Sequence, residues 1–494
     1  MTPALDVRGL RVDFGGSPVV DGVSLAVAPG ECVAIVGESG AGKSLTARAL
    51  LGLLPSAASV RTERMTVGGV DATGLREHGW RALRGSRIAL VSQDALVSLD
   101  PLQRIGREVA EARRLHGLAA GRDEVQALLR RVWMPEPELR ARQYSHQLSG
   151  GLRQRALIAS ALSADPAVLV ADEPTTALDA TVQARVLALL REIADAGTAV
   201  LFISHDFAAV RRLADRVLVM RAGIVVEEGP VREVLENPQH EYTRQLIEAT
   251  QHSPRDVQAP VSDRVLVATG VSKSFGETAA VAEASFAVPK GRTLGIVGES
   301  GSGKTTLARM LVGVEQPDAG ELHWSGSPRV QLVHQNPLGA FDPRWTIGRS
   351  LREALVAGRV PRAKRAARVA ELMHEVDLDP ALATRRPIAL SGGQRQRAAI
   401  ARALAAEPDV LVLDEPVSAL DPSVRERVLQ LLVRLQRERR LTMIFVSHDL
   451  DVVGAVADEV LVMQDGRIVE QGATGAVFAA PQHPFTRELL AAGS

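Results

Sequence analysis

The sequence contains two copies of a glycine-rich segment whose residue types suit phosphate binding. GESGAGKS spans Gly37–Ser44 and GESGSGKT spans Gly298–Thr305. Both fit the P-loop pattern GxxxxGK[ST], in which glycines let backbone N–H groups surround phosphate oxygens, the lysine reaches the outer phosphates and the hydroxyl is offered to Mg²⁺. Only five residues are lysine, against 53 arginines, and two of those five stand in these loops. A chance glycine turn is the alternative, and the second copy argues against it.

Two acidic residues end an apolar run in each copy. The runs VLVADE and VLVLDE end in Asp172–Glu173 and Asp414–Glu415. Each run predicts a buried strand that delivers two carboxylates to the phosphate end of a sheet. The aspartate would hold Mg²⁺, and the glutamate would orient or deprotonate the attacking water. The alternative is that these acids end a strand and cap the next helix.

A third repeated motif predicts an exposed helix start. LSGGLRQR spans Leu148–Arg155 and LSGGQRQR spans Leu390–Arg397. Ser149 and Ser391 are expected to be N-caps, and the glycines after them open a basic helix whose start suits an anion. Because each copy already has a phosphate loop, this second site is expected to face another nucleotide. An ordinary capped helix is the alternative.

The spacing of the motifs indicates a tandem duplication. In both copies the serine of the third motif precedes the acidic glutamate by 24 residues. From the loop lysine to a downstream glutamine the interval is 50 residues in the first copy and 31 in the second. The second copy therefore lacks 19 residues, in a segment that includes Asp71–Gly79. We predict domains at 1–250 and 264–494 and a linker at 251–263, which carries two prolines and little apolar content.

The elements that must position these motifs alternate between strand and helix, which predicts an α/β fold with a mainly parallel sheet and a helical subdomain in each half. In the first half we expect a strand at Cys32–Val36, a helix from Lys43 to about Leu54, a strand at Arg87–Val91, a helical region over Ile105–Arg142, strands at Val168–Ala171 and Ala199–Ile203, and a helix at Thr181–Ala196.

Composition narrows the class of protein. The 494 residues are 46% hydrophobic and 23% charged, with 58 basic and 58 acidic residues, which indicates a globular chain and argues against nucleic acid as the main partner. Cys32 is the single cysteine, so a disulfide framework, a cysteine zinc site and an iron–sulfur cluster are excluded. No apolar stretch approaches the roughly 18 residues of a membrane span, and we expect a soluble chain.

Taken together, the motifs resemble the nucleotide-binding domains of ATP-binding cassette (ABC) proteins over nearly the whole chain, twice. The resemblance implies two tandem P-loop NTPase domains that use ATP and Mg²⁺. It identifies Gln93 and Gln335 with the Q-loop glutamine and His205 and His448 with the switch histidine. It identifies Asp179 and Asp421 with the D-loop, and Phe14 and Phe275, each 29 residues before its loop lysine, with the aromatic residue that stacks on adenine. Structural histidines, solvated glutamines and core phenylalanines are the alternatives.

The site residues that the resemblance implies are the catalytic Glu173, Glu415, His205 and His448; the ATP-binding Phe14, Gly37, Glu38, Ser39, Gly40, Ala41, Gly42, Lys43, Ser44, Leu45, Gln93, Ser149, Gly150, Gly151 and Asp172 of the first half; the ATP-binding Phe275, Gly298, Glu299, Ser300, Gly301, Ser302, Gly303, Lys304, Thr305, Thr306, Gln335, Ser391, Gly392, Gly393, Gln394 and Asp414 of the second; and Ser44, Gln93, Asp172, Thr305, Gln335 and Asp414 for Mg²⁺.

Family architecture further implies a head-to-tail pairing of the two halves. One ATP would lie between the first phosphate loop and Ser391–Gln394, and the other between the second loop and Ser149–Leu152. Leu152 departs from the glutamine that is usual at its position, so one contact is expected to be lost there. Both halves keep the lysine, glutamine, aspartate, glutamate and histidine, and two hydrolytically competent sites are expected.

Finer stretches resemble the ATPase subunits of oligopeptide, dipeptide and nickel importers. They are ALVSLDPLQRIG (95–106), PLGAFDPRWTIG (337–348), NPQHEYTRQLIEA (237–249) and PQHPFTRELLAA (481–492). This implies an energy-coupling subunit of a peptide importer, peripheral on the cytoplasmic side of the inner membrane, with two integral-membrane permease subunits and a solute-binding protein. The group's cysteine-bound iron–sulfur motif is absent, because Cys32 is the only cysteine.

Other function classes remain open on the sequence alone. They are an importer of a nickel chelate or another solute, an exporter, a soluble ATPase that acts on ribosomes, and a DNA-repair ATPase. Against the ribosomal class stand the short, lightly charged linker and the neutral net charge. Against the DNA-repair class stands the absence of zinc cysteines and of long coiled-coil insertions.

Overall fold

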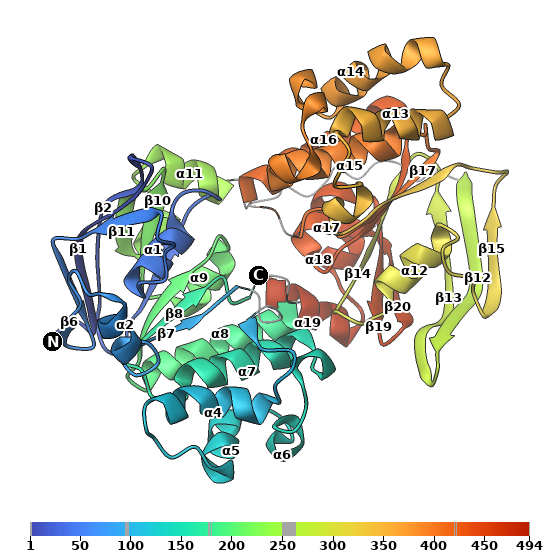
Figure 1. Cartoon of the computed structure of the whole chain (residues 1–494). Helices are drawn as coiled ribbons and strands as arrows, with labels where there is room; N and C mark the ends of the chain where they lie inside the picture. Colours follow the sequence, from blue (N-terminus) through green and yellow to red (C-terminus); the bar gives the residue numbers. More distant parts are fainter. Residues whose placement is uncertain are drawn as a thin grey trace. The chain divides into compact units, whose positions relative to one another are not determined.

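The computed structural model describes residues 2–93, 98–175, 178, 180–248, 263–418, 420 and 422–493. Within them the elements β1 to α11 form one compact unit and β12 to α19 another (Figure 1). The predicted linker lies outside the described residues except for Asp263, and Asp179 and Asp421 lie outside them too. None of the described helices combines the length and the apolar character that a membrane crossing needs.

The first unit is built on a six-stranded sheet of order β11-β10-β3-β9-β8-β7, in which every pair but β10–β11 is parallel. All residues of β3, β8 and β9 are buried, as continuous apolar strands covered on both faces should be. The elements are β1 Leu5–Phe14, β2 Ser17–Val27, β3 Cys32–Val36, α1 Lys43–Leu50, β4 Ala58–Arg61, β5 Arg64–Val67, β6 Val70–Asp71, α2 Glu77–Leu83, β7 Ile88–Val91, α4 Ile105–Leu115, α5 Arg122–Arg131, α6 Pro137–Arg140, the 3-10 turn Ser145–Gln147, α7 Gly150–Leu162, β8 Val168–Asp172, α8 Ala180–Asp195, β9 Ala199–Ile203, α9 Phe207–Leu213, β10 Arg216–Arg221, β11 Ile224–Pro230, α10 Val231–Glu236 and α11 Glu241–Glu248.

The second unit repeats this plan with the sheet β16-β17-β18-β14-β19-β20, again parallel but for its last pair. Its elements are β12 Arg264–Phe275, β13 Thr278–Pro289, β14 Thr293–Gly298, α12 Lys304–Leu311, β15 Ala319–Trp324, β16 Val330–Val333, α13 Ile347–Ala357, α14 Arg365–Glu375, α15 Gly392–Leu404, β17 Val410–Asp414, α16 Pro422–Arg439, β18 Thr442–Val446, α17 Leu450–Val456, β19 Glu459–Gln464, β20 Arg467–Ala473, α18 Thr474–Ala479, α19 Pro484–Gly493, and 3-10 turns at Pro337–Ala340, Arg362–Lys364, Pro380–Thr384 and Pro387–Ala389.

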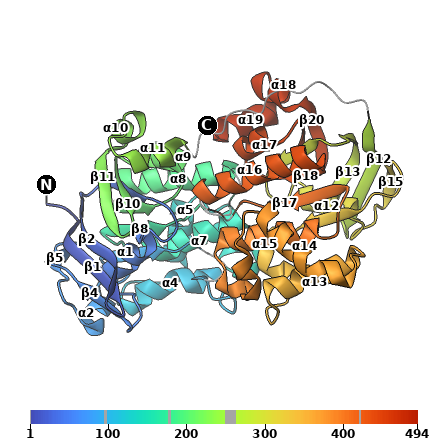
Figure 2. The ribbon, with the colours of Figure 1, turned by 90° about the horizontal axis from the view of Figure 1, so that it is seen from above.

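A second, antiparallel sheet accounts for the difference in length between the copies. In the first unit β1 pairs with β2, β4 and β5, and β6 pairs with β5. In the second unit β12 pairs with β13 and β15, and these strands gather at one edge beside α12 (Figure 2). The segment predicted to be extra in the first copy forms β6 and the start of α2. The segment, which its composition predicts to be surface-like, is partly buried at Ala72, and α2 buries Trp80 and Leu83 directly after it.

Two predicted boundaries need correction. The helix expected to reach about Leu54 ends at Leu50, because Gly52 takes a left-handed φ of 60° and Leu53 N–H donates to Arg48 O at 2.8 Å, a Schellman-type stop. The helical region expected over Ile105–Arg142 is divided into α4, α5 and α6. Trp133 and Glu136 interrupt it with φ values of 55° and 48°.

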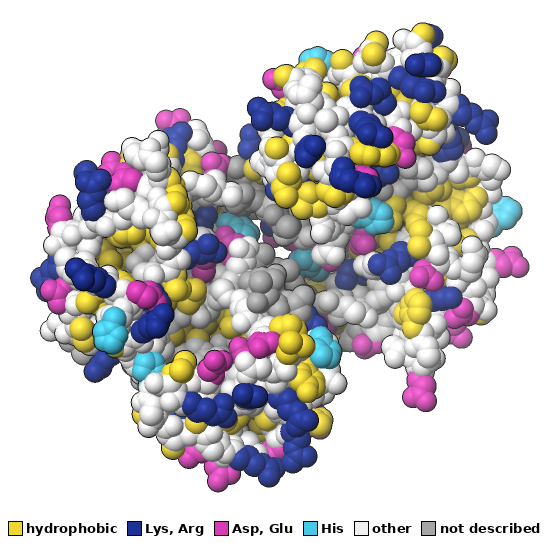
Figure 3. Space-filling model, viewed as in Figure 1, with side chains coloured by type: hydrophobic (Ala, Val, Ile, Leu, Met, Phe, Trp, Pro, Cys, Tyr) yellow, Lys and Arg dark blue, Asp and Glu magenta, His cyan; other side chains and the backbone are white. Residues whose placement is uncertain are grey.

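The helical subdomain of the first unit packs through α4 and α7, which lie side by side (Figures 1 and 2). The inner faces of α4 and α5 are buried in the core through Val109, Ala110 and Leu129. The outer face carries a row of basic side chains (Figure 3). The exposed arginines of α4 and α5 are Arg107, Arg114, Arg122, Arg130 and Arg131.

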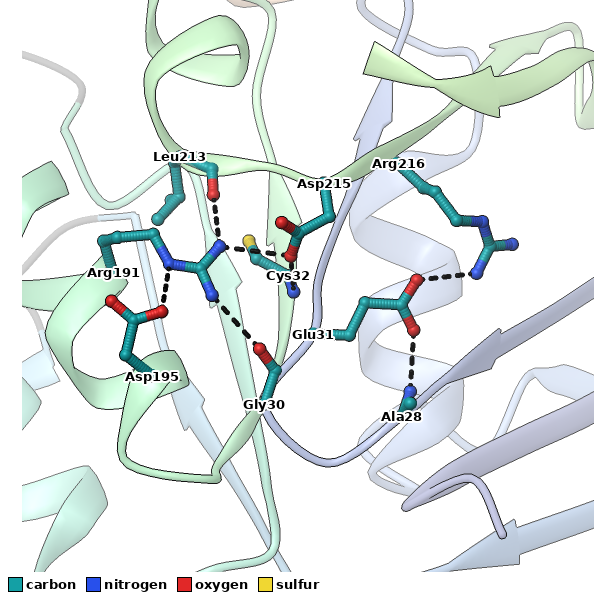
Figure 4. Close-up of polar contacts among 9 residues, drawn as sticks. All are labelled: Ala28, Gly30, Glu31, Cys32, Arg191, Asp195, Leu213, Asp215 and Arg216. Carbon is teal, nitrogen blue, oxygen red and sulfur yellow. Dashed lines mark hydrogen bonds and ion pairs between the residues drawn. The ribbon is translucent and has the colours of Figure 1, made fainter. Parts of the chain in front are cut away.

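Arg191 on α8 ties that helix to the sheet of the first unit (Figure 4). Its guanidinium donates to Gly30 O at 3.1 Å, to Leu213 O at 3.0 Å and to Asp215 Oδ2 at 3.1 Å. Asp215 Oδ2 also accepts the Cys32 N–H at 2.8 Å. One side chain therefore joins the start of β3, the end of α9 and the start of β10. Beside it, Glu31 accepts from Arg216 Nη1 at 2.8 Å.

Candidate functional site

Each phosphate loop follows the central strand of its sheet, and the lysine side chain of the loop is bonded to carbonyl oxygens of the same loop. Lys43 Nζ donates to Gly37 O at 2.7 Å and to Glu38 O at 3.0 Å. Lys304 Nζ donates to Gly298 O at 2.8 Å, to Glu299 O at 2.7 Å and to Ser302 Oγ at 3.4 Å. Both lysine side chains are buried, so each ammonium is placed inside its loop rather than in solvent.

The first glycine of each loop cannot be replaced by a residue that has a Cβ. A Cβ at Gly37 would lie 2.2 Å from Met220 O, and a Cβ at Gly298 would lie 2.1 Å from Met463 O. The two glycines have φ values of 151° and 154°. Each loop therefore leaves its strand in contact with the backbone at the end of β10 or β19, which only glycine permits.

The hydroxyl at the end of each loop meets the aspartate that ends the neighbouring strand. Ser44 Oγ donates to Asp172 Oδ1 at 3.0 Å, and Thr305 Oγ1 donates to Asp414 Oδ1 at 3.3 Å. Burial raises the pKa of Asp172 and of Asp414, against the hydrogen bond from the hydroxyl. In the first half the structure thus brings together two predicted Mg²⁺ ligands that lie 128 residues apart in the sequence.

A glutamine and a histidine contact the carboxylate of the predicted catalytic glutamate in each half. Gln93 Nε2 donates to Glu173 Oε2 at 3.0 Å, and His205 Nδ1 lies 3.3 Å from Glu173 Oε1. In the second half, Gln335 Nε2 donates to the equivalent carboxylate at 2.9 Å, and the equivalent histidine lies 3.2 Å from it. All three residue types therefore converge, although Gln93 and Glu173 are 80 residues apart.

The backbone that presents these glutamates is unusual for residues with side chains. Glu173 has a φ of 48° and Glu415 a φ of 46°, in the left-handed region. The next strand fixes this conformation, because Glu173 N–H donates to Ile203 O and Glu415 N–H to Val446 O, both at 2.9 Å. Non-glycine residues in this region cluster at functional sites.

Electrostatics in the second half favour a charged pair. Burial alone would lower the pKa of His448, but the hydrogen bond and charge of Glu415, with the charge of Asp449, outweigh it and raise that pKa. Burial alone would raise the pKa of Glu415, and His448 and Lys304 lower it. The carboxylate is therefore kept ionised beside an imidazole that holds its proton more firmly than usual.

The serine–glycine motifs begin α7 and α15 as predicted. Ser149 Oγ accepts from Leu152 N at 3.4 Å, and Ser391 Oγ accepts from Gln394 N at 3.3 Å. Gln394 also reaches back, accepting the Ser391 N–H at 3.0 Å and completing a capping box. Leucine at the equivalent position in the first half cannot do this, and it packs against the hydrophobic core instead.

Comparisons with known proteins now bear on this geometry. The family model of the ABC transporter matches residues 20–176 and 281–418, and that of the oligopeptide/dipeptide transporter, C-terminal region, matches 226–259. The peptidoglycan transport ATP-binding protein of Agrobacterium fabrum is 43% identical over 99% of this chain and 96% of its own. The chain belongs to the ABC transporter family.

Further relatives agree with this family assignment. The glutathione import ATP-binding protein of Shigella flexneri is 41% identical over 96% of this chain and 86% of its own. Among solved structures, a model of ribosome-bound archaeal Pelota and ABCE1 has a TM-score of 0.71 at 22% identity, covering 97% of this chain and 80% of that chain. RNase-L Inhibitor has a TM-score of 0.66 at 23% identity, covering 94% and 90%. The solved structures show the fold alone.

As an ABC ATPase, the chain binds ATP and couples its hydrolysis to transport, and the predicted fold of two ABC-type α/β halves is confirmed. Phe14 and Phe275 are the last residues of β1 and β12. Phe275 is 50% exposed, with Lys273 Nζ 5.8 Å from its ring centroid, whereas Phe14 packs partly on the core. The two rings predicted to have one role thus stand in different surroundings.

Sequence reasoning missed one contact to a phosphate loop. The Glu38 N–H donates to the hydroxyl of Tyr242, on α11, at 3.1 Å. The residues are 204 positions apart, and the segment that carries Tyr242 had been recognised only as a subfamily feature. The available signal was a difference between the copies, EYT in the first against PFT in the second.

Proposed function

We propose that this ABC ATPase powers the import of peptides. The observation that carries the proposal is the match of residues 226–259 to the oligopeptide/dipeptide transporter C-terminal region. The relatives named above are a peptidoglycan transport protein and a glutathione import protein. Glutathione is a tripeptide, and peptidoglycan carries peptide stems, so the named cargoes share peptide bonds.

We propose that the two loops, with their lysines, hold the ATP phosphates, and that Mg²⁺ binds beside each loop. Ser44 and Asp172 offer the first half a hydroxyl and a carboxylate oxygen that already lie 3.0 Å apart, and Gln93 adds an amide. Oxygen ligands of this kind suit Mg²⁺, which needs few protein ligands when phosphates and waters supply the rest. The ion would neutralise negative charge on the phosphates. Thr305, Gln335 and Asp414 form the equivalent set.

The chain's own residues would then prepare the water that attacks the outermost phosphate. Glu173 and Glu415, fixed by the next strand, orient that water and accept its proton. Gln93 and Gln335 hold one carboxylate oxygen of each glutamate, and His205 and His448 approach the other. Lysine N–H groups and loop amides stabilise charge that develops on the phosphate oxygens.

We further propose that the serine–glycine motif of each half faces the ATP held by the other half, at Ser149–Gly151 and Ser391–Gln394. Closure of two such halves around ATP, and reopening after hydrolysis, would drive two integral-membrane permease subunits that receive peptide from a solute-binding protein. The chain would act peripherally, at the cytoplasmic side of the inner membrane. The glutathione import protein named above supports this proposal.

Uptake measurements test the transport proposal. Cells that carry the chain with Lys43→Ala and Lys304→Ala should lose accumulation of labelled di-, tri- and oligopeptides, because neither phosphate loop retains its lysine. Lys290→Ala, at an exposed lysine outside both loops, is the matched control and should transport normally. Unchanged peptide uptake in the double variant contradicts the proposal, and loss of nickel uptake alone reassigns the cargo.

Purification tests the partners. The tagged chain with Glu173→Gln and Glu415→Gln, isolated with ATP from detergent-solubilised membranes, should carry two multi-span proteins and a solute-binding protein. Recovery of ribosomes without a membrane protein would contradict an importer.

A further inference from the structure

The two halves differ by one oxygen atom at the contact between the C-terminal helix and the phosphate loop. Tyr242 near the start of α11 and Phe485 near the start of α19 occupy equivalent positions and are both buried. The hydroxyl of Tyr242 accepts the Glu38 N–H at 3.1 Å. Phenylalanine has no atom that can accept the corresponding N–H of Glu299.

The turn that places the two rings is held by the same hydrogen bonds in both halves, so these bonds do not account for the difference at the loop. In the first half, Glu227 accepts the backbone N–H groups of Gln239 and His240 at 2.7 and 3.1 Å, and His240 Nδ1 accepts the Tyr242 N–H at 3.1 Å. In the second half, Glu470 accepts from the equivalent turn at 2.8 and 3.0 Å, and the Phe485 N–H is bonded to a histidine at 3.2 Å.

A second contact of Tyr242 is also confined to the first half. The Arg221 guanidinium lies 4.9 Å from the Tyr242 ring centroid, in cation–π contact. Arg221 ends β10, directly after the Met220 carbonyl that Gly37 approaches. Gln464 stands at the equivalent end of β19. The end of β10, the loop and α11 therefore meet at one tyrosine.

The peptide group between Gly37 and Glu38 links Tyr242 to the loop lysine. Its N–H, from Glu38, is held by Tyr242, and its carbonyl oxygen, Gly37 O, accepts from Lys43 Nζ at 2.7 Å, while Glu38 O accepts from the same ammonium at 3.0 Å. The second half supports its lysine from within the loop, because Ser302 Oγ accepts from Lys304 Nζ at 3.4 Å. Alanine stands at the position of Ser302 in the first loop. A hydroxyl thus supports the lysine-bearing loop in both halves, but it comes from a different element in each.

We propose that Tyr242 is a positioning residue for the first phosphate loop: its hydroxyl fixes the peptide of Glu38, and with it the Lys43 ammonium, and so strengthens nucleotide binding in the first half only. This inference rests on the proposed role of the loops in holding ATP phosphates. It makes α11, within the segment matched to the oligopeptide/dipeptide transporter region, part of the ATP site of one half.

The test measures ATP affinity one half at a time in the full chain, by displacement of a fluorescent ATP analogue in the presence of Mg²⁺. Lys304→Ala disables the second loop, and Lys43→Ala disables the first. In the Lys304→Ala background, Tyr242→Phe should weaken ATP binding roughly two- to tenfold, the value of one net hydrogen bond. In the Lys43→Ala background it should change nothing.

Two outcomes would overturn the inference: unchanged affinity in the Lys304→Ala background, or equal weakening in both backgrounds. The melting temperature of the nucleotide-free chain serves as the folding control. A purely structural hydroxyl would lower it and leave the affinity of the folded chain unaltered. In steady-state hydrolysis, Tyr242→Phe should raise KM for ATP with little change in kcat.

A rescue variant tests the equivalence of the two hydroxyls. Ala41→Ser, added to Tyr242→Phe, gives the first loop the serine of the second and should restore affinity. Failure to restore it overturns that equivalence. If Lys43→Ala with Lys304→Ala does not abolish binding, the proposed role of the loops fails. If it does and Tyr242→Phe has no effect, this inference alone fails.

Discussion

The two halves of the chain hold the same cluster of proposed catalytic residues through different supporting side chains. Around the glutamates, the paired distances of glutamine and histidine agree within 0.1 Å, at 3.0 and 2.9 Å for the glutamine and at 3.3 and 3.2 Å for the histidine. Away from the cluster the hydrogen-bonding side chains change. The comparison teaches that duplication conserved the positions of reacting groups, and left free the means of holding them.

The connection between helix and sheet shows this freedom most clearly. In the first half Arg191 of α8 joins Gly30, Leu213 and Asp215. In the second half two side chains make the corresponding contacts. Gln436 of α16 donates to Gly291 O, and Arg292 forms an ion pair with Asp458 at 3.4 Å. One feature is retained unchanged, since Asp215 and Asp458 each accept the N–H that begins the central strand at 2.8 Å.

Removal of the catalytic glutamates should give the largest effect and tests the identity of the two clusters. Glu173→Gln with Glu415→Gln should lower ATP turnover by about 100- to 10,000-fold, because the amide cannot accept the proton of water. Each single variant should retain turnover at the other site, measured by phosphate release. If Glu173→Gln alone abolished turnover and Glu415→Gln left it intact, the halves would not be catalytically equivalent.

Removal of Arg191 and removal of Gln436 should lower the free energy of unfolding by different amounts. Arg191→Ala removes several hydrogen bonds at once and should destabilise the first half by about 1–3 kcal/mol. Gln436→Ala removes the bond to Gly291 and should destabilise the second half by about 1 kcal/mol. Hydrogen exchange at β3 and β14, followed by mass spectrometry, measures each half separately. A larger loss in the second half would reverse the comparison.

A smaller effect is expected at the helix caps. Gln394→Leu removes the returning bond of the capping box and should destabilise the second half by about 0.5–1 kcal/mol. Leu152→Gln offers the first half the same bond but gives up the leucine's packing on the core. Thermal unfolding should therefore show a loss for Gln394→Leu and little change for Leu152→Gln. Unchanged stability of Gln394→Leu would show that the box adds nothing.

No reaction at all is expected at Cys32. Burial raises the pKa of its thiol well above the usual range, against a smaller opposing effect of the Arg191 charge. The reactive thiolate is therefore not formed at pH 8 in the folded chain. Ellman's reagent should label no thiol in the native protein and one thiol per chain in guanidinium. Native labelling would show that the start of β3 opens.

Much of the fold could be read from the sequence because it depends on local signals. Ala199–Ile203 was predicted with its observed bounds, since a buried parallel strand is a continuous apolar run. Ser149 and Ser391 were predicted as caps from residue type alone. The early end of α1 was missed although Gly52 signals it.

The rest depends on contacts between distant residues. That Glu38 bonds Tyr242 requires β3, β10 and α11 to be placed together in space, which no local pattern specifies. The left-handed conformation of Glu173 is imposed by Ile203 of the next strand. The sequence predicts equivalent positions for Phe14 and Phe275. The exposure of each ring depends on the neighbouring strands, and of the two rings only that of Phe275 is largely exposed.

The ion pair beside Arg191 bears on how a duplicated chain folds. Glu31 pairs with Arg216 in the first half, and the equivalent positions hold Arg292 and Glu459, with the charges reversed. Two homologous halves synthesised on one chain risk exchanging strands while both are incomplete. Such an exchange would set Glu31 against Glu459 and Arg292 against Arg216, and like charges repel. We therefore expect the reversal to disfavour the exchanged assembly at Glu31, whereas Arg292, which pairs with Asp458, would still meet the equivalent Asp215.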